Sequence, residues 1–239
     1  MIRWGEVVPG SQTEVGIGVT GAIRCTLRVD GKAQAVILKR GSSAEILAEA
    51  FSALLLRAWG LPVPDPYLVD ESGAIAFASA EQAYPNLAQR IGLDSIPAGT
   101  AAATAAALLA CKVVSELPTT PLALVADEAI ANPDRNFGNI LWDGADEQWI
   151  DHALAFTAGN VPNQLAEMAK HAGAADALRG AAVTQWLAID RLAPRAALDA
   201  MPPCLDAGRH AQFVCAQLSQ LGNRILIRFP QPDDLLSGV

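Results

Sequence analysis

The sequence predicts a mixed α+β fold, in which a small β-rich N-terminal lobe is followed by a larger, mostly helical lobe. Three observations support this prediction. The N-terminal third of the chain alternates short apolar stretches with glycine-containing turns, which is typical of strands and hairpins. From about residue 98 onward, longer stretches with helical periodicity predominate. The chain has 239 residues, 51% of them hydrophobic, which is enough to form the core of one large domain or of two small lobes.

The first lobe is predicted at residues 1–79, and its strongest local signal is a hairpin. The stretches 22–29 and 33–39 flank Asp30-Gly31, a dipeptide typical of two-residue hairpin turns. The other elements expected in this lobe are a helix over about 44–59, with Ser42 or Ser43 as its N-cap, and strands near 67–69 and 74–77.

The second lobe is predicted at residues 80–239. A polar segment, 132–139, interrupts its helical pattern, and such a loop between regular elements often contains functional groups. The elements expected around it are helices over 98–116 and 120–131, a hairpin with strands at 140–142 and 148–151, further helices from 162 to about 224, and a loose tail from 229.

Charge and composition exclude several classes of protein. Seventeen Lys and Arg residues against 25 Asp and Glu give a net charge of -8, which argues against binding to nucleic acid or to an anionic membrane. The sequence shows no apolar segment long enough to span a membrane and no signal peptide at its start, so we expect a cytoplasmic protein. The four cysteines and three histidines lack the spacing of a zinc site or a disulfide framework.

Two segments of the second lobe indicate phosphate chemistry. Asp134 and Asn139 have the spacing D-x-x-x-x-N, which in protein kinases supplies the residue that takes the proton of the nucleophile and a magnesium ligand. Asp151 ends an apolar strand of the predicted hairpin that begins directly after Asn139, so it can return to the same loop. An amide and a carboxylate suffice for Mg²⁺, which keeps water and phosphate among its ligands.

Two further segments lie in the first lobe. Lys39 ends an apolar strand, and Glu49 lies on the helix that follows, which matches the Lys–Glu ion pair that positions nucleotide phosphates. A glycine-rich turn between strands, whose backbone could approach phosphate oxygens, contains Gly16, Gly18, Thr20 and Gly21. Each segment alone has an ordinary structural explanation, such as a capped turn or a solvated charge. Their order along the chain is what favours a kinase-like fold that binds ATP.

Three segments of the chain resemble those of a known family. The pattern N-x-D-R-N-x-G-N at 132–139, with I-D-H at 150–152, is similar to the N-x-D-R-H-x-x-N and I/V-D-F/H signatures of HipA-like kinases and phosphatidylinositol 3/4-kinases. The segment 49–64, EAFSALLLRAWGLPVP, resembles the HipA-like segment in which an acidic helix ends in G-L-P-V-P. The resemblance spans about 15–156 in this numbering and leaves the final third of the chain unassigned.

The resemblance implies a bilobal kinase that binds ATP and Mg²⁺ in its cleft and transfers the γ-phosphate to a Ser/Thr hydroxyl of a protein. It implies that Lys39 binds phosphates, Glu49 orients Lys39, Asp134 is the base, and Asn139 and Asp151 hold magnesium. The hinge that receives adenine would be Phe77, Ala78, Ser79, Ala80 and Glu81. Whether the protein has an antitoxin or other regulatory partner stays open.

Two departures keep alternatives open. Asn136 stands where the family has His, and the glycine turn matches neither known phosphate-loop pattern closely. One alternative is therefore a pseudokinase that binds nucleotide or a partner without transfer. Another is a small-molecule kinase of the aminoglycoside or choline type, although Asn132 and Pro133 stand where those enzymes have His and Gly.

Overall fold

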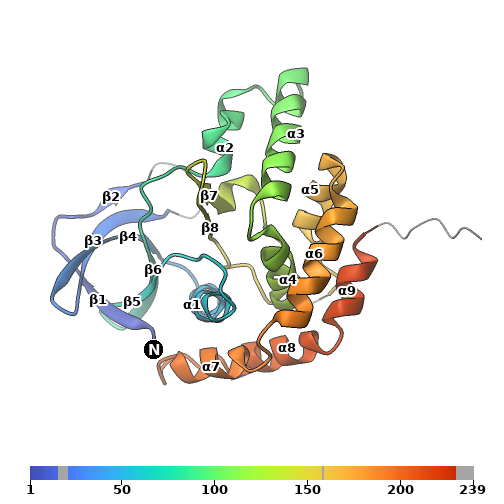
Figure 1. The fold of residues 1–239 in the computed structure, drawn as a ribbon. Coiled ribbons are helices and arrows are strands. Elements are labelled where there is room, and N and C mark those ends of the chain that lie inside the picture. The colour runs from blue at the N-terminus through green and yellow to red at the C-terminus, as the bar shows by residue number, and fades with distance from the viewer. Residues whose placement is uncertain (16–20, 158, 230–239) are drawn as a thin grey trace, which may run out of the picture.

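The computed structural model describes residues 1–15, 21–157 and 159–229. Strands dominate its N-terminal part and helices its C-terminal part, as Figure 1 shows. The α+β class predicted from the sequence is therefore confirmed, while the division into two lobes at residues 79 and 80 stays a prediction.

The N-terminal part contains a six-stranded sheet. Its strands are β1 (Arg3–Val7), β2 (Thr13–Glu14), β3 (Ile23–Val29), β4 (Lys32–Lys39), β5 (Pro66–Glu71) and β6 (Ala74–Ala80), in the order β1-β5-β6-β4-β3-β2. Strand β1 runs parallel to β5 and also pairs antiparallel with β3, so the sheet curls back on itself. The predicted hairpin is confirmed as β3 and β4, with Asp30 and Gly31 both at positive φ in its turn.

Helix α1 (Ser43–Ala58) begins where the sequence predicts. Ser42 is its N-cap and forms a capping box with Glu45, in which each side chain accepts a hydrogen bond from the other residue's backbone N–H. The helix buries Glu49 almost completely, together with its apolar face. It ends before Gly60, whose φ of 85° favours glycine.

The C-terminal part is built from helices around one small hairpin. Its elements are α2 (Leu87–Arg90), α3 (Ala101–Glu116), α4 (Thr120–Ile130), β7 (Ile140–Trp142), β8 (Glu147–Trp149), α5 (Gln164–Ala172), α6 (Ala175–Ala188), α7 (Ala193–Ala200), α8 (Gly208–Leu218) and α9 (Leu221–Ile227), with 3-10 turns at Leu93–Ser95 and Phe137–Asn139. The predicted hairpin strand 148–151 is wrong at its end, because β8 stops at Trp149 and Asp151 follows in a loop.

No single helix among the described residues has the length and apolar composition of a membrane span. The described helices α3 and α4 have the required length and apolar composition only when taken together, and these two helices meet at a bend of 95°.

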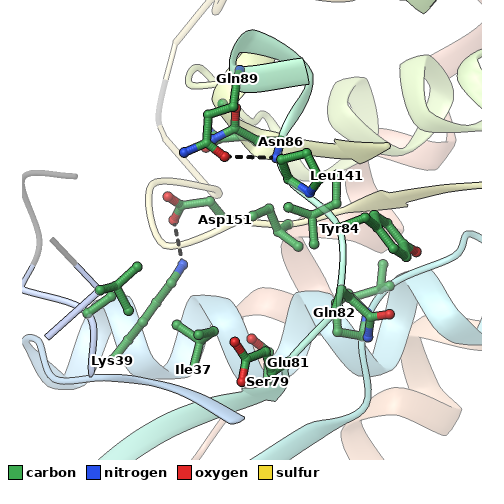
Figure 2. Close-up of a pocket in the computed structure, with 18 of the residues that line it drawn as sticks. Ile37, Lys39, Ser79, Glu81, Gln82, Tyr84, Asn86, Gln89, Leu141 and Asp151 are labelled. Carbon is green, nitrogen blue, oxygen red and sulfur yellow. Dashed lines mark hydrogen bonds and ion pairs between the residues drawn. The ribbon is translucent and has the colours of Figure 1, made fainter. Parts of the chain in front are cut away.

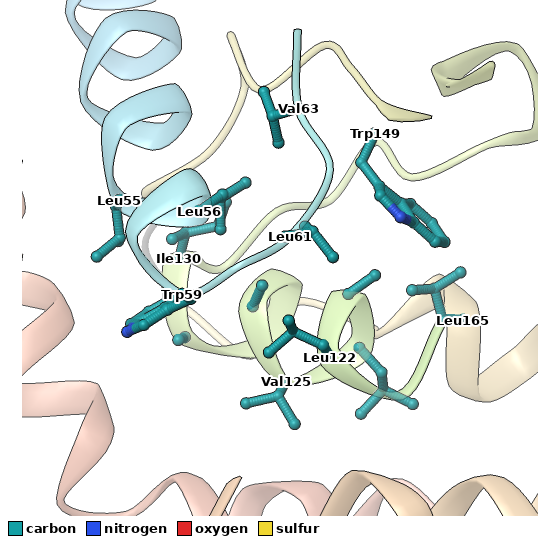
Figure 3. Packing of buried hydrophobic residues seen from close by; sticks show 14 of the residues in the cluster. Leu55, Leu56, Trp59, Leu61, Val63, Leu122, Val125, Ile130, Trp149 and Leu165 are labelled. Carbon is teal, nitrogen blue, oxygen red and sulfur yellow. The ribbon is translucent and has the colours of Figure 1, made fainter. Parts of the chain in front are cut away.

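Two hydrophobic cores lie beneath these elements. The smaller one fills the curled sheet and includes Leu27, Val36 and Leu38. The larger one joins α1 to the C-terminal helices: Figure 3 shows Leu56 of α1, and Trp59 directly after it, lying close to residues of α4. Helix α1 thus follows the first strands in sequence but packs into the helical part, which places Glu49 at the junction of the two parts.

Candidate active site

A cleft of about 830 Å³ lies between the sheet and the C-terminal part. One side is formed by β4 and β6, and the other by the loop 136–139, Leu141 and the segment 150–152. The chain linking β6 to α2, residues 81–86, closes one end. Figure 2 shows Lys39 of β4 and Asp151 of the segment 150–152 meeting in this space, with Leu141 beside them.

Lys39, Glu49 and Asp151 meet in the cleft, although Asp151 lies far from the other two in sequence. Lys39 Nζ lies 2.5 Å from Glu49 Oε1 and 2.9 Å from Asp151 Oδ1. Burial alone would lower the pKa of Lys39, but the two carboxylates outweigh it and raise the pKa above its usual range. Lys39 is therefore a fixed cation in the cleft, and in Figure 2 its side chain reaches across to Asp151.

Asp151 adopts a backbone conformation that is uncommon among residues other than glycine. Its φ is 63°, in the left-handed region, and such a conformation persists only where the surroundings enforce it. The next residue supplies part of that enforcement, because the backbone N–H of His152 donates to Glu49 Oε2 at 3.1 Å. Glu49 thus binds Lys39 with one oxygen and the chain beside Asp151 with the other.

Asp134 and Asn139 also come together, at the mouth of the same cleft. The amide nitrogen of Asn139 donates to the backbone oxygen of Asp134 at 2.6 Å and lies 3.3 Å from Asp134 Oδ2. Asn136 donates to Asp134 Oδ1 at 3.2 Å. Asn139 lines the cleft directly, whereas Asp134 stands half-buried at its edge. The carboxylate of Asp134 is thus oriented by two amides of its own loop.

Arg135 braces this loop from the inside. Its guanidinium forms two hydrogen bonds to the Asp127 carboxylate, at 2.8 and 3.0 Å. It also donates to the backbone oxygens of Asn139 and Ile150, at 2.9 and 3.0 Å. These bonds join the loop of Asp134 to the strand end that precedes Asp151, so one buried side chain sets the spacing of the two segments.

His152 connects the brace to the cleft. Arg135 Nη2 lies 3.0 Å from His152 Nε2, and because a guanidinium can only donate, the ring nitrogen must accept. Burial, with the positive charges of Arg135 and Lys39, holds the pKa of His152 well below its ordinary value. The ring is therefore neutral and carries its proton on Nδ1, which lies 4.0 Å from Glu49 Oε2.

The predicted hinge is only partly in the cleft. Phe77, Ser79, Ala80 and Glu81 line it, while Ala78 is fully buried and packs in the sheet core, because alternate residues of a strand face opposite sides. The backbone N–H of Glu81 donates to Ala35 at 2.9 Å, so Glu81 still continues the pairing of the sheet. The linker proper therefore begins after Glu81, later than the sequence predicts.

The glycine turn is described only at its end. Gly16, Gly18 and Thr20 lie outside the described residues. Gly21 is exposed at a φ of 61°, and the adjacent Ala22 lines the cleft. The predicted contact of this turn with phosphates stays a prediction.

Two cleft residues were missed from the sequence. Asn86 and Gln89 form a capping box on α2, in which Asn86 Oδ1 accepts from the Gln89 N–H at 2.9 Å and Gln89 Oε1 accepts from the Asn86 N–H at 3.2 Å. Both side chains line the cleft, where Figure 2 shows them above Asp151. The N-x-x-Q spacing was a readable helix start, but so short a helix leaves no periodic pattern around it.

Comparison with solved structures identifies the fold. The proinflammatory kinase CtkA of Helicobacter pylori matches 92% of this chain and 98% of its own, with 14% identity and a TM-score of 0.56. The chain has a kinase-like fold. This confirms the kinase-like fold predicted from the order of the sequence features.

A second solved structure is HipA of Shewanella oneidensis MR-1, in complex with HipB and its operator DNA. The match covers 91% of this chain and 65% of that chain, with 15% identity and a TM-score of 0.49. No protein-family model matches the sequence, and no curated protein matches it either.

Proposed function

We propose that this protein is an ATP-dependent phosphotransferase that uses magnesium and phosphorylates a Ser/Thr hydroxyl of a protein. The observation that carries the proposal is the junction of Lys39, Glu49 and Asp151 in one cleft, with Asn139 lining the same cleft. Elements of both parts of a kinase-like fold supply these residues, and the ion pair of Lys and Glu is one of the conditions for phosphoryl transfer in kinases.

ATP would lie along the cleft with its adenine toward the linker. Ile37 and Leu141 line opposite walls there and offer apolar faces to a base, and the linker 82–85 offers backbone groups. The phosphates would then reach Lys39. Asn86 and Gln89 also line the cleft, above Asp151 in Figure 2, and their amide nitrogens can donate to oxygens of the sugar or of a phosphate.

The chemistry of the cleft fits magnesium bound together with phosphate. Among the described residues no group of three or more His, Cys, Asp or Glu side chains could hold a metal ion alone. Asn139 uses its amide nitrogen on Asp134, so its oxygen is the atom that can bind a cation, together with the Asp151 carboxylate. Two protein oxygens suit Mg²⁺, which keeps water and phosphate in its coordination sphere. When bound, the ion would neutralise phosphate charge.

In the proposed reaction the oxygen of the acceptor hydroxyl bonds to the γ-phosphorus, and Asp134 accepts the hydroxyl proton. The bond between the γ-phosphorus and the oxygen that bridges it to the β-phosphate breaks, and ADP leaves. The two amides of Asn136 and Asn139 aim the carboxylate. Lys39 holds the phosphates against the attacking oxygen, and Glu49 keeps Lys39 in place.

One observation favours a second candidate, a pseudokinase. The Asp134 carboxylate stands at the edge of the cleft and is already engaged by both neighbouring amides. If those amides hold it away from an acceptor, nucleotide would bind without transfer.

The test is incubation of the purified protein with γ-labelled ATP and magnesium, followed by detection of autophosphorylation and of released phosphate. We expect label transfer or slow hydrolysis in the wild type and its loss in Asp134→Ala. Nucleotide binding with neither activity would support the pseudokinase. Absence of nucleotide binding would contradict both candidates.

A further inference from the structure

We propose that helix α8 is an internal brace that holds α1 and the segment after Asp151 in their active positions, and that His210 is its positioning residue. The inference rests on the proposed function, because the groups that α8 aligns are those assigned to nucleotide binding. Helix α8 follows Asp151 only after three intervening helices, α5 to α7, in the region that contains no recognisable motif.

The first contact of the brace is with α1. Phe51 lies on this helix shortly after Glu49 and is fully buried. The centroid of its ring lies 6.0 Å from that of His210 and 5.9 Å from that of Phe156. A shift of α1 that moved Glu49 away from Lys39 would therefore also disturb these ring contacts.

The second contact is with the segment that follows Asp151. The Phe156 ring packs edge-on against His210 with centroids 4.3 Å apart, and against Phe213 of α8 at 5.8 Å. Phe156 has a φ of 64°, and its N–H donates to Ile130. The unusual backbone conformations at Asp151 and Phe156 thus delimit a short segment whose far end rests on α8.

His210 is an unusual residue for this place. Among the described residues its Nδ1 is buried without a hydrogen-bond partner, a condition that destabilises a fold and calls for an explanation. The ring of His210 contacts both Phe51 and Phe156, and no other described ring of α8 does so. We assign the positioning role to these ring contacts. The ring therefore matters for alignment of the site, whereas its buried nitrogen does not.

Two hydrogen bonds to backbone oxygens of α7 and of the turn before it add to the brace. The indole N–H of Trp59, at the end of α1, donates to the backbone oxygen of Asp190 at 2.9 Å. The N–H of Ile2, next to β1, donates to Ala200 at 3.1 Å. In Figure 1 α7 lies beneath α1, and α8 continues from it toward α9. The C-terminal helices thus hold the end of α1 and the residue before β1.

The test compares three variants of the full chain. His210→Ala removes the ring, His210→Phe keeps an aromatic ring without the nitrogen, and His171→Ala is the control, because His171 is an exposed histidine of α5. Two quantities are measured: amide hydrogen exchange in residues 43–58 and 151–156, and kcat and KM for ATP in phosphoryl transfer.

We expect His210→Ala to speed exchange in both segments and to lower kcat by about tenfold or more, because even a small misplacement of reacting groups is costly. The KM for ATP should change by less than about threefold, since the nucleotide contacts lie on the sheet and the linker. His210→Phe should restore both quantities, and His171→Ala should change neither.

The brace is overturned if His210→Ala leaves exchange in both segments unchanged, or if His210→Phe fails to restore it. Should His210→Ala not fold, Phe213→Leu, which loosens the same contact to Phe156, is expected to speed exchange in 151–156, and unchanged exchange there contradicts the brace. The exchange comparison requires no turnover. Absence of phosphoryl transfer in the wild type would therefore count against the proposed function alone.

Discussion

Two clusters of charged and polar side chains lie side by side at the cleft, and they differ in their access to solvent. The inner cluster consists of Asp127, Arg135 and His152, whose side chains are at most 2% exposed. The outer cluster consists of Lys39, Glu49 and Asp151, in which the lysine and the aspartate are 18% and 30% exposed. One cluster is sealed in the protein, and the other opens to the cleft.

This difference separates a scaffold from a binding site. In the inner cluster the guanidinium forms hydrogen bonds to a carboxylate, two backbone oxygens and a ring nitrogen, so its donors are satisfied within the protein. In the outer cluster Lys39 and Asp151 face space that a ligand can fill. His152 joins the two, because its backbone N–H binds Glu49 and its ring binds Arg135. The scaffold thus fixes the geometry of the site without contacting substrate.

The largest expected effect is on stability, from breaking the inner cluster. Arg135→Met removes the cation and leaves the buried Asp127 carboxylate without its ionic partner. Such a change should lower the free energy of unfolding by about 3–5 kcal/mol, measured by urea denaturation. The matched control is Lys170→Met, which breaks an exposed pair with Glu167 on α5 and should cost less than about 1 kcal/mol. Equal losses in the two variants would contradict the scaffold role.

Breaking the outer cluster should affect phosphoryl transfer strongly and stability less than breaking the inner cluster does. Lys39→Met should lower the free energy of unfolding by about 1–3 kcal/mol, because Glu49 loses one partner but keeps the backbone N–H of His152. Phosphoryl transfer should fall by about 100-fold or more, since a preorganised charge is lost. Adenosine affinity, measured by calorimetry, should change little. Transfer at the wild-type rate would show that the assignment of Lys39 is wrong.

Two histidines, the buried His152 and the half-buried His210, predict a dependence of stability on pH. Burial lowers the pKa of His210, and burial with the charges of Arg135 and Lys39 lowers that of His152. The unfolded chain therefore binds protons that the folded protein does not. This contribution to stability is present above about pH 6.5 and is lost as the pH falls below it, at up to about 1.4 kcal/mol per pH unit for the fully buried His152 and at less for the half-buried His210.

The measurement is urea denaturation of the wild type and of His210→Phe at several pH values from about 7.5 to about 5.5. The variant should lose stability less steeply than the wild type on acidification, because the proton that His210 takes up on unfolding is no longer part of the balance. Identical slopes would show that His210 is not kept neutral by its surroundings.

Local signals predicted much of the fold. The Asp30-Gly31 turn and the Ser42 cap are short patterns whose structural meaning depends on neighbouring residues alone. Strand β1 was missed because its partners lie far along the chain: it pairs in parallel with β5, on the far side of β2, β3, β4 and α1 in sequence. Helix α2 was missed because a single short turn does not form a periodic pattern.

The candidate site could be predicted only where its residues follow a known order. Lys39, Glu49, Asp134, Asn139 and Asp151 were identified in this way, and the structure brings them to one cleft and its edge. The ion pair of Arg135 with Asp127 could not be predicted, since Asp127 lies inside an apolar helix without any local sign. His210 could not be predicted at all, because its meaning arises from packing between three distant segments.

The central claim is that the outer cluster binds nucleotide together with magnesium. It is tested most directly by calorimetric titration of ATP into the wild type and Asp151→Asn, with and without magnesium. Because an amide supplies less charge to the ion than a carboxylate does, we predict that magnesium strengthens ATP binding in the wild type and has no effect in the variant. An equal effect of magnesium on both proteins would contradict the account.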